Sequence, residues 1–219
     1  MITTHKTTSL QNSLLSARLH DPFSYLGVHR EKGRTLVRVF RPHDVNVWIR
    51  TTIGYEPMSR IHANGIFEWR GEFPPEMPYR LRIEAKGDTQ SVYETYDAYA
   101  FPLQISDHDV YLFNEGKLRQ AYRMLGAQRV RNSGVDGVRF SVWAPNAGRV
   151  SVVGDFNRWD GRIHPMAVHH ASGVWELFIP DLPPNALYKY EIRNRNSVRS
   201  CSKPILMPIA MNSVPTQPR

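Results

Sequence analysis

The stretch Val138-Arg139-Phe140-Ser141-Val142-Trp143 decides the fold, because apolar and polar side chains alternate along it with a period of two. This period is typical of a strand that buries one face. Stretches rich in β-branched and aromatic residues alternate in the same way elsewhere, with Gly, Pro, Asn and Asp between them: 35–40, 45–49, 79–83 and 188–192. Short strands separated by turn residues predict an all-β protein built of antiparallel sheets.

These stretches also form an internal repeat. Residues 37–42 have a counterpart in 138–145, 45–47 in 150–152, 65–69 in 173–177, and 79–83 in 188–192. The offset grows from 103 between Pro42 and Pro145 to 109 between Tyr79 and Tyr188, as small loop insertions would produce. We therefore expect two tandem immunoglobulin-like β-sandwiches with a short helical connection between them.

The repeat divides the chain into five parts. We expect a disordered leader over 1–20, a first sandwich over 21–117, a helix and linker over 118–136, and an incomplete second sandwich over 137–194, followed by an aberrant tail over 195–219. Within the connection, Leu118, Tyr122 and Leu125 have helical spacing, with Gly126 as the C-terminal cap. Residues 127–134 then read as an exposed loop.

Composition excludes several classes of protein. The chain of 219 residues has one cysteine, so it has no internal disulfide, and no apolar run approaches the ~18 residues of a membrane span. We expect a cytoplasmic protein. The net charge of +8 is spread along strands on which Arg and Lys alternate with acids, which argues against a nucleic-acid partner.

Catalytic and cofactor motifs are missing from the sequence. It contains no P-loop, no G-x-S-x-G elbow, no H-E-x-x-H and no C-x-x-C, and the acids on turns suggest no catalytic pair. His164, His169 and His170 with a nearby aspartate are the one combination that could bind a metal, and a polar loop explains them better. We expect no cofactor, no metal and no membrane partner.

Aromatic residues point to a different chemistry. Trp159 stands in a turn, beside Asn157, in the stretch Gly154-Asp155-Phe156-Asn157-Arg158-Trp159-Asp160-Gly161. Flat aromatic rings stack on the C–H faces of sugars, and amide groups bond sugar hydroxyls. Two interpretations follow with equal weight: a glycan-binding loop, or a tryptophan packed against the sandwich edge or the other domain.

Several stretches together resemble the bacterial 1,4-α-glucan (glycogen) branching enzymes. They are Asp21-Pro22-Phe23-Ser24-Tyr25-Leu26-Gly27-Val28-His29 and Tyr111-Leu112-Phe113-Asn114-Glu115-Gly116, then 137–147, 150–162, 164–166 and 173–180. The resemblance implies two N-terminal sandwiches, the second similar to a family 48 carbohydrate-binding module. It also implies a catalytic (β/α)₈ barrel as their partner, although 219 residues leave no room for its ~250.

The resemblance assigns functions to individual residues. Trp159 and Lys189 match positions that line the glucan groove in glycan-binding relatives. A second groove tryptophan would follow Ile192, where this sequence departs from the pattern. The barrel of the family carries the residues that cut an α-1,4 link and form an α-1,6 branch, so no catalytic residue is assigned here. We expect a chain that binds α-glucan and is not an enzyme by itself.

The last stretch of the sequence breaks the family pattern. Residues 195–219 contain no acid and carry Arg195, Arg199, Lys203 and Arg219, half of the net charge of +8. Back-translation from Val198 in another frame permits V-L-L-K-T-D-P-Y-A, which resembles the missing family segment. We therefore hypothesise a frameshift near Ser197 that removes the last strand of the second sandwich.

Two functions remain open from the sequence. The chain is either the glucan-positioning part of a branching enzyme or a free-standing α-glucan-binding or scaffolding protein. Retention on glycogen, with Trp159→Ala as the control, distinguishes the second reading from an inert remnant.

Overall fold

The computed structural model describes residues 2–31, 33–72, 74–86, 92–169, 172–183, 185–195, 200–201 and 207–208. The strands of the first half are β1 (Gly27–Glu31), β2 (Arg34–Phe40), β3 (Asp44–Thr51), β4 (Gly54–Pro57), β5 (Ser59–His62), β6 (Ile66–Gly71), β7 (Arg80–Ala85) and β8 (Val92–Tyr96). Those of the second half are β9 (Gly126–Asn132), β10 (Val135–Trp143), β11 (Ala147–Gly154), β12 (Ala167–His169), β13 (Val174–Pro180), β14 (Leu187–Asn194), β15 (Ser200–Cys201) and β16 (Met207–Pro208).

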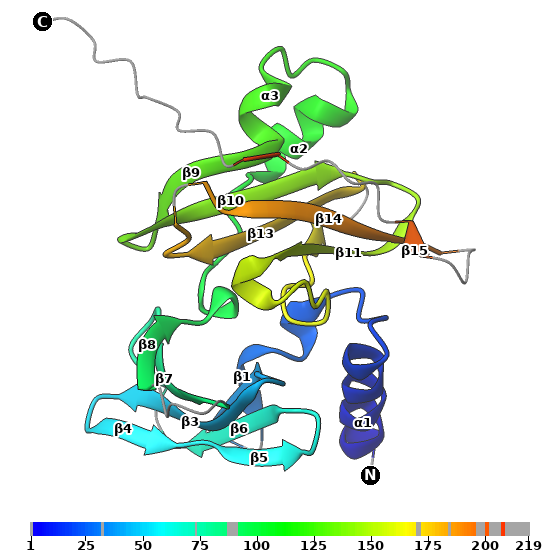
Figure 1. Cartoon of the computed structure of the whole chain (residues 1–219). Coiled ribbons are helices and arrows are strands. Elements are labelled where there is room, and N and C mark those ends of the chain that lie inside the picture. Colours follow the sequence, from blue (N-terminus) through cyan, green and yellow to red (C-terminus); the bar gives the residue numbers. More distant parts are fainter. Residues whose placement is uncertain are drawn as a thin grey trace, which may run out of the picture.

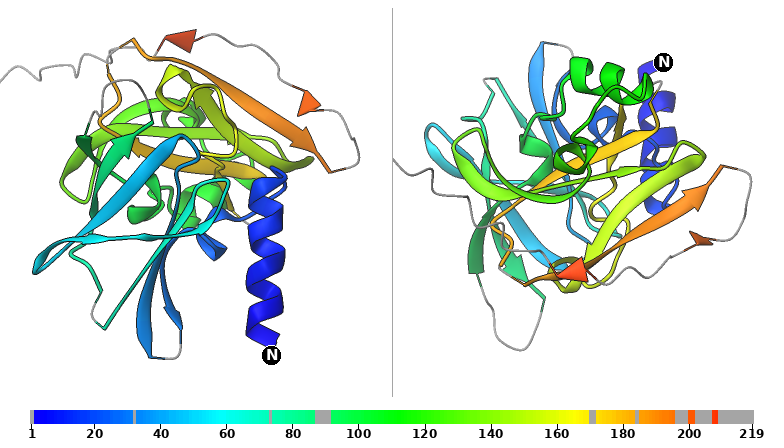
Figure 2. Two further views of the ribbon diagram at one scale, coloured as in Figure 1. Left: turned by 60° about the horizontal axis from the view of Figure 1, so that its bottom comes forward. Right: turned by 90° about the horizontal axis from the view of Figure 1, so that it is seen from above.

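The strands form four antiparallel sheets, two in each half of the chain (Figure 1). The first sandwich consists of the sheets β1-β2-β6-β5 and β4-β3-β7-β8. The second consists of β12-β13-β10-β9 and of β11-β14-β15, with β16 also paired to β14. Two tandem β-sandwiches are therefore confirmed. Seen from above, the second lies over the first (Figure 2).

The pairing confirms the internal repeat. Strand β2 pairs with β6 as β10 pairs with β13, and β3 pairs with β7 as β11 pairs with β14. Gly65 and Gly173 hold equivalent turns, each with a positive φ and with no room for a Cβ against the chain at Pro42 or Pro145. A glycine is needed there because both sterics and φ exclude a side chain.

The hydrogen-bond register refines the alignment of the repeat at one place. A bulge interrupts β3 at Asp44/Asn46 and β11 at Ala147/Arg149, and directly after it Val47 faces Ile83 while Val150 faces Ile192. Val47 is thus the counterpart of Val150, two residues away from the match that the sequence suggested. The alignment of 79–83 with 188–192 agrees with this register.

The N-terminal segment differs from the disordered leader expected for 1–20. It forms helix α1 (Ile2–Leu15), and Leu14 and Leu19 are buried at 1% and 2% exposure. Both leucines belong to the apolar cluster that also contains Phe40 of the first sandwich and Trp175 of the second. The helix has few apolar residues and no clear amphipathic face, so the sequence does not predict it. Packing of its last residues against the two sandwiches stabilises it.

The connection also differs from the expectation. The main helix is α2 (Asp107–Asn114), which starts inside the range assigned to the first sandwich, and α3 (Ala121–Met124) is a single turn. Tyr122 is 67% exposed, so its spacing from Leu118 did not mark a buried face. The predicted loop at 127–134 is largely strand β9, paired along β10. Both helices lie on the side of the second sandwich that faces away from the first (Figure 1).

An incomplete second sandwich would leave β14 with an unpaired edge on the side away from β11. The structure shows that this edge is partly paired. The short strands β15 and β16 pair with it, through Ile192 with Cys201 and Tyr188 with Met207. Most of the predicted tail, and with it the frameshift hypothesis, lies outside the described residues.

Contacts between the two sandwiches fix their mutual position. The Tyr99 hydroxyl, in the 3₁₀ turn η2 (Ala98–Ala100), donates to the carbonyl of Pro165 at 3.0 Å, and the Phe101 ring packs on Phe178 at 4.8 Å between centroids. The buried Glu176 carboxylate accepts from the backbone N–H groups of Gln104 and Ile105. These bonds satisfy polar groups that would otherwise be buried without partners.

Candidate functional site

The loop between β11 and β12 holds Trp159 at the surface. It begins with the turn η3 (Asp155–Asn157), and the next two residues, Arg158 and Trp159, have φ of 54° and 60°. Two consecutive non-glycine residues with positive φ are sterically unfavourable and tend to occur at functional sites. The Trp159 Nε1–H donates to Asp155 Oδ1 at 2.8 Å, which fixes the ring. Trp159 is 39% exposed to solvent.

Asn157 shapes this loop from inside, which corrects its expected role as a glucan contact. It is 3% exposed. Its Oδ1 accepts from the Gly154 N–H at 2.9 Å, and its Nδ2 donates to the Val152 carbonyl at 2.8 Å and lies 3.0 Å from Nδ1 of His164. Both polar atoms of the amide are therefore engaged by the chain itself, which leaves them turned away from a ligand at the surface.

Lys189, which the resemblance matches to a groove position, lies on β14 beside the tryptophan. Its neighbours Tyr188 and Tyr190 pack into the core, so the strand alternation turns Lys189 outward. The Lys189 Nζ lies 5.2 Å from the centroid of the Trp159 ring. This distance is within the range of a cation–π contact. The structure thus brings two of the three predicted residues together.

The pair offers what a sugar chain requires. An exposed indole presents an apolar face for the C–H groups of a pyranose, and the ammonium supplies three hydrogen-bond donors beside it. The second groove tryptophan expected after Ile192 is missing, because the sequence has no tryptophan after Trp175. The surface therefore has one aromatic platform rather than two.

Asp160 of the same loop pairs with Arg162 and lies close to a histidine of the first sandwich. Asp160 accepts from the Arg162 guanidinium at 2.7 Å, and its other contact is His43 Nε2 of the first sandwich at 3.9 Å. Burial raises the pKa of Asp160, but the bonds from Arg162 outweigh this and hold the pKa below its ordinary value. The Arg162 guanidinium also lies 5.6 Å from the centroid of the Phe40 ring, so the Trp159 loop packs against the first sandwich.

The histidines considered for a metal have structural partners. His164 contacts Asn157, and burial, with the charge of Arg41, lowers its pKa to about 3. His169 Nε2 lies 2.8 Å from Glu176 Oε2. His170 lies outside the described residues. Among the described residues no cluster of three or more His, Cys, Asp or Glu could hold a metal ion.

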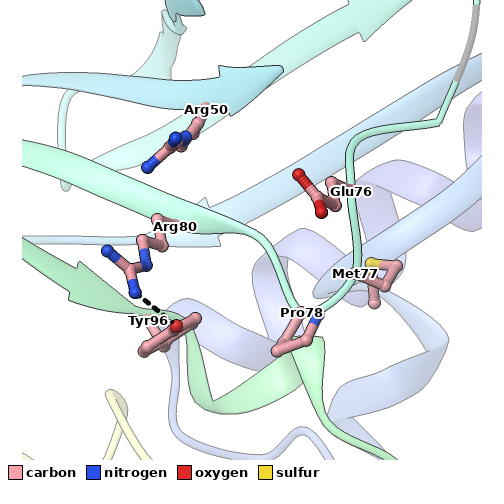
Figure 3. Close-up of a pocket in the computed structure, with 6 residues that line it drawn as sticks. All are labelled: Arg50, Glu76, Met77, Pro78, Arg80 and Tyr96. Carbon is pink, nitrogen blue, oxygen red and sulfur yellow. Dashed lines mark hydrogen bonds between the residues drawn. The ribbon is translucent and has the colours of Figure 1, made fainter. Parts of the chain in front are cut away.

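One cluster escaped the sequence reasoning. Arg80 on β7 lies beside Tyr96 on β8 and lines a pocket with Arg50 and the segment 76–78 (Figure 3). The signal was present in the repeat, which aligns Arg80 with Lys189.

None of the helices in the described part of the chain is long and apolar enough to cross a membrane.

Comparison with known proteins gives two family matches. Residues 7–99 match the family "alpha-1,4-glucan branching enzyme GlgB, N-terminal domain", and residues 124–208 match "Carbohydrate-binding module 48 (Isoamylase N-terminal domain)". The second match extends beyond residue 194, where the sequence placed the end of the sandwich.

Curated relatives match over nearly the whole chain but only part of their own length. The 1,4-alpha-glucan branching enzyme GlgB of Nitrosospira multiformis is 62% identical over 188 residues, 85% of this chain and 25% of the relative. That of Nitrosomonas europaea is 63% identical over 189 residues, 86% and 26%. The chain thus spans about a quarter of these relatives. Among solved structures, PulA of Klebsiella oxytoca aligns with TM-score 0.31 and 18% identity, over 81% of this chain and 19% of PulA.

Proposed function

We propose that this chain, which belongs to the N-terminal domains of the GlgB glycogen branching enzymes, binds α-glucan at its Trp159–Lys189 surface and positions it for the branching reaction. The observation that carries the proposal is the Lys189 Nζ, 5.2 Å above an exposed tryptophan ring, in a module of the family 48 type. A ring fixed by its own N–H bond costs little entropy when a ligand stacks on it.

The proposal divides the work of branching between this chain and a catalytic barrel. The barrel of the family would cut the α-1,4 link and rejoin the chain as an α-1,6 branch, while the two sandwiches hold a glucan segment near it. The chain as it stands would bind glucan without branching it. An iodine-stain branching assay tests this part, and a fall in absorbance over time with the purified chain would contradict it.

Electrophoresis through gels that contain glycogen tests the binding surface. We expect the wild-type chain to be retarded, and Trp159→Ala to weaken the interaction about tenfold, which is roughly 1.4 kcal/mol, because the stacking platform is lost. Lys189→Ala should weaken it less, because the ring remains.

Trp143→Ala is the matched control. Trp143 is also exposed, at 54%, but its ring packs beside the Phe113 ring. It is not one of the predicted sugar contacts. Its removal should leave the retardation unchanged. Equal losses for the two tryptophan variants, or no loss for Trp159→Ala, would refute the assignment of the surface. The cytoplasmic location expected from the sequence belongs to the same proposal and is tested by cell fractionation.

A further inference from the structure

The repeat places Arg80 of the first sandwich at the position of Lys189 in the second. In each sandwich the register after the bulge pairs equivalent residues, Val47 with Ile83 and Val150 with Ile192. Three residues before these isoleucines stand Arg80 and Lys189. Both lie on the strand next to the bulged one, and both point away from the core, since the residues beside them, Tyr79 and Tyr188, are buried.

The two cations also make the same kind of contact. The Arg80 guanidinium carbon lies 4.8 Å from the centroid of the Tyr96 ring, compared with 5.2 Å for Lys189 and Trp159. The Arg80 Nη2 also donates to the Tyr96 hydroxyl at 2.8 Å. The aromatic partner comes from a paired strand rather than from a loop, since Tyr96 faces Arg80 across β7 and β8. An aromatic ring with a cation over it therefore occurs at one ladder position in both sandwiches.

The surroundings of Arg80 extend this contact into a band across the sheet. Strand pairing puts Tyr55 opposite Arg50 and Tyr96 opposite Arg80. Arg50 and Arg80 lie on the outer face of the sheet β4-β3-β7-β8, because the paired Ile49 and Leu81 beside them are buried. The guanidinium of Arg82 covers the Tyr55 ring at 4.0 Å, and the Tyr96 ring also packs on Phe101 at its inner edge. With neighbouring strands ~4.8 Å apart, the two tyrosines are separated by ~14 Å. We call these four residues, Tyr55, Arg50, Arg80 and Tyr96, the first-module band.

A wall beside the band turns it into a pocket. The segment before β7 contributes Glu76, Met77 and Pro78 to the lining. Figure 3 shows Glu76 directed toward the two arginines and Pro78 beside Tyr96, while the Met77 side chain extends from the other side of the segment. Met77 is 51% exposed and adds apolar surface, while Glu76 adds a hydrogen-bond acceptor. The pocket therefore combines an aromatic ring, an apolar edge, two planar donors and one acceptor.

We propose that this pocket and the first-module band form a second binding site for a neutral α-glucan chain, separate from the Trp159–Lys189 surface. The ligand class rests on the proposed function of that surface, whose cation and aromatic ring recur here. The Glu76 carboxylate offsets part of the charge of Arg50 and Arg80 and adds an acceptor, which a ligand with hydroxyl groups can use and a fully ionised phosphate cannot. Sugar hydroxyls use both the guanidinium donors and the carboxylate acceptor, and a pyranose face uses the tyrosine ring.

Two sites on two rigidly packed sandwiches would act together on a long glucan. Once a polymer is bound at one site, the other samples it at a high effective concentration. Short oligosaccharides would then bind each site weakly, whereas glycogen would be retained strongly by the chain as a whole.

Titration of the ¹⁵N-labelled full chain with maltoheptaose, followed through amide chemical shifts, tests the proposal. We expect two separate groups of shifted amides, one around Trp159 and Lys189 and one around Arg80 and Tyr96. The double variant Arg50→Ala/Arg80→Ala should weaken binding in the second group at least tenfold and leave the first unchanged. Both arginines are exposed, so this variant should keep its fold, which the dispersion of the spectrum verifies.

Two controls accompany the titration. Arg129→Ala removes an exposed strand arginine of the second sandwich, far from the pocket in sequence, and should change neither group. Inorganic phosphate serves as the anionic probe and should shift neither group at the concentration at which maltoheptaose does.

Each outcome decides between the sites. Shifts around Trp159 alone would overturn the second site and leave the proposed function intact. Shifts around Arg80 alone would support the second site and overturn the Trp159–Lys189 surface. No shift anywhere would overturn both. A second group that survives Arg50→Ala/Arg80→Ala, or that answers to phosphate instead of maltoheptaose, would also refute the inference.

Discussion

Protonation of His164 should destabilise the fold at mildly acidic pH. The Asn157 Nδ2 has two hydrogens, of which one goes to the Val152 carbonyl and the other is directed at His164 Nδ1, 3.0 Å away. The histidine nitrogen must therefore accept, which only a neutral imidazole can do. Burial, and after it the positive charge of Arg41, lowers the pKa of His164 from 6.5 to about 3.

The sign of the pH effect follows from the two pKa values. In the unfolded chain the histidine gains its proton near its ordinary pKa, 6.5, while in the folded chain it resists protonation until about 3. Between these values the unfolded state binds more protons, so the folded state loses stability as the pH falls. From pH 7 to pH 5 the linkage relation gives a loss of about 2 kcal/mol for this one group. The figure hardly changes for any folded pKa below about 4, because the unfolded state dominates the window.

Urea unfolding of the wild type and of His164→Gln, each at pH 5, 6 and 7, measures this loss. Glutamine does not titrate in the window, so the free energy of unfolding of the wild type should fall about 2 kcal/mol more than that of the variant between pH 7 and pH 5. Any constant cost of the substitution cancels in this difference, as do the other titrating groups. Parallel dependences on pH for the two proteins would show that burial and the charge of Arg41 do not hold His164 neutral in the folded state.

Three further substitutions test the packing, each measured by urea unfolding at pH 7. Leu14→Ala should lower the free energy of unfolding by about 2–4 kcal/mol, because α1 packs on the sandwiches through this buried side chain. Ser9→Ala, at an exposed position of the same helix, should change it very little. Equally small effects of the two substitutions would support a disordered leader instead of a docked helix. Glu176→Gln should lower the free energy of unfolding by about 2–4 kcal/mol, because an amide cannot accept all three hydrogen bonds from the Gln104 N–H, the Ile105 N–H and His169. A loss below about 0.5 kcal/mol would mean that the fold does not depend on the carboxylate. Gly173→Ala should be clearly worse than Gly134→Ala, since both have positive φ but only Gly173 lacks space for a methyl group, and comparable losses would contradict the tight turn at Pro145.

The strand order was predictable because each core strand alternates in the sequence and occurs twice. Val138 and Phe140 are buried in the core with the less buried Arg139 between them. Val37 and Val39 are buried in the same way, but Arg38 between them is buried as well and pairs with Glu68 at 2.8 Å. Strand β9 was missed because its inward positions are not all apolar. Asn132 is buried in place of an aliphatic residue, and its Nδ2 donates to the Pro102 carbonyl at 2.9 Å, a partner that no local pattern reveals.

Helix α2 was missed although its start is marked in the sequence. The Ser106 hydroxyl accepts from the Asp109 N–H at 3.1 Å, which is the N-cap bond that a serine three residues before an acid predicts. The leader could not be predicted in the same way. Leu14 is buried only because residues from both sandwiches surround it, and this neighbourhood is absent from the first twenty residues.

The candidate sites show how far local sequence can identify function. Trp159 was a candidate because it stands in a turn, and Lys189 because the family resemblance matches it to a groove position; their role in binding stays a prediction. Asn157 was misjudged because the same turn can direct an amide outward or inward. The Arg80–Tyr96 contact needed more than a pattern. The repeat supplies the cation, but the aromatic partner comes from a loop in one sandwich and from strand β8 in the other, so aligning the two copies cannot locate it. Only the strand pairing does, and this is why the second site follows from the structure and not from the sequence.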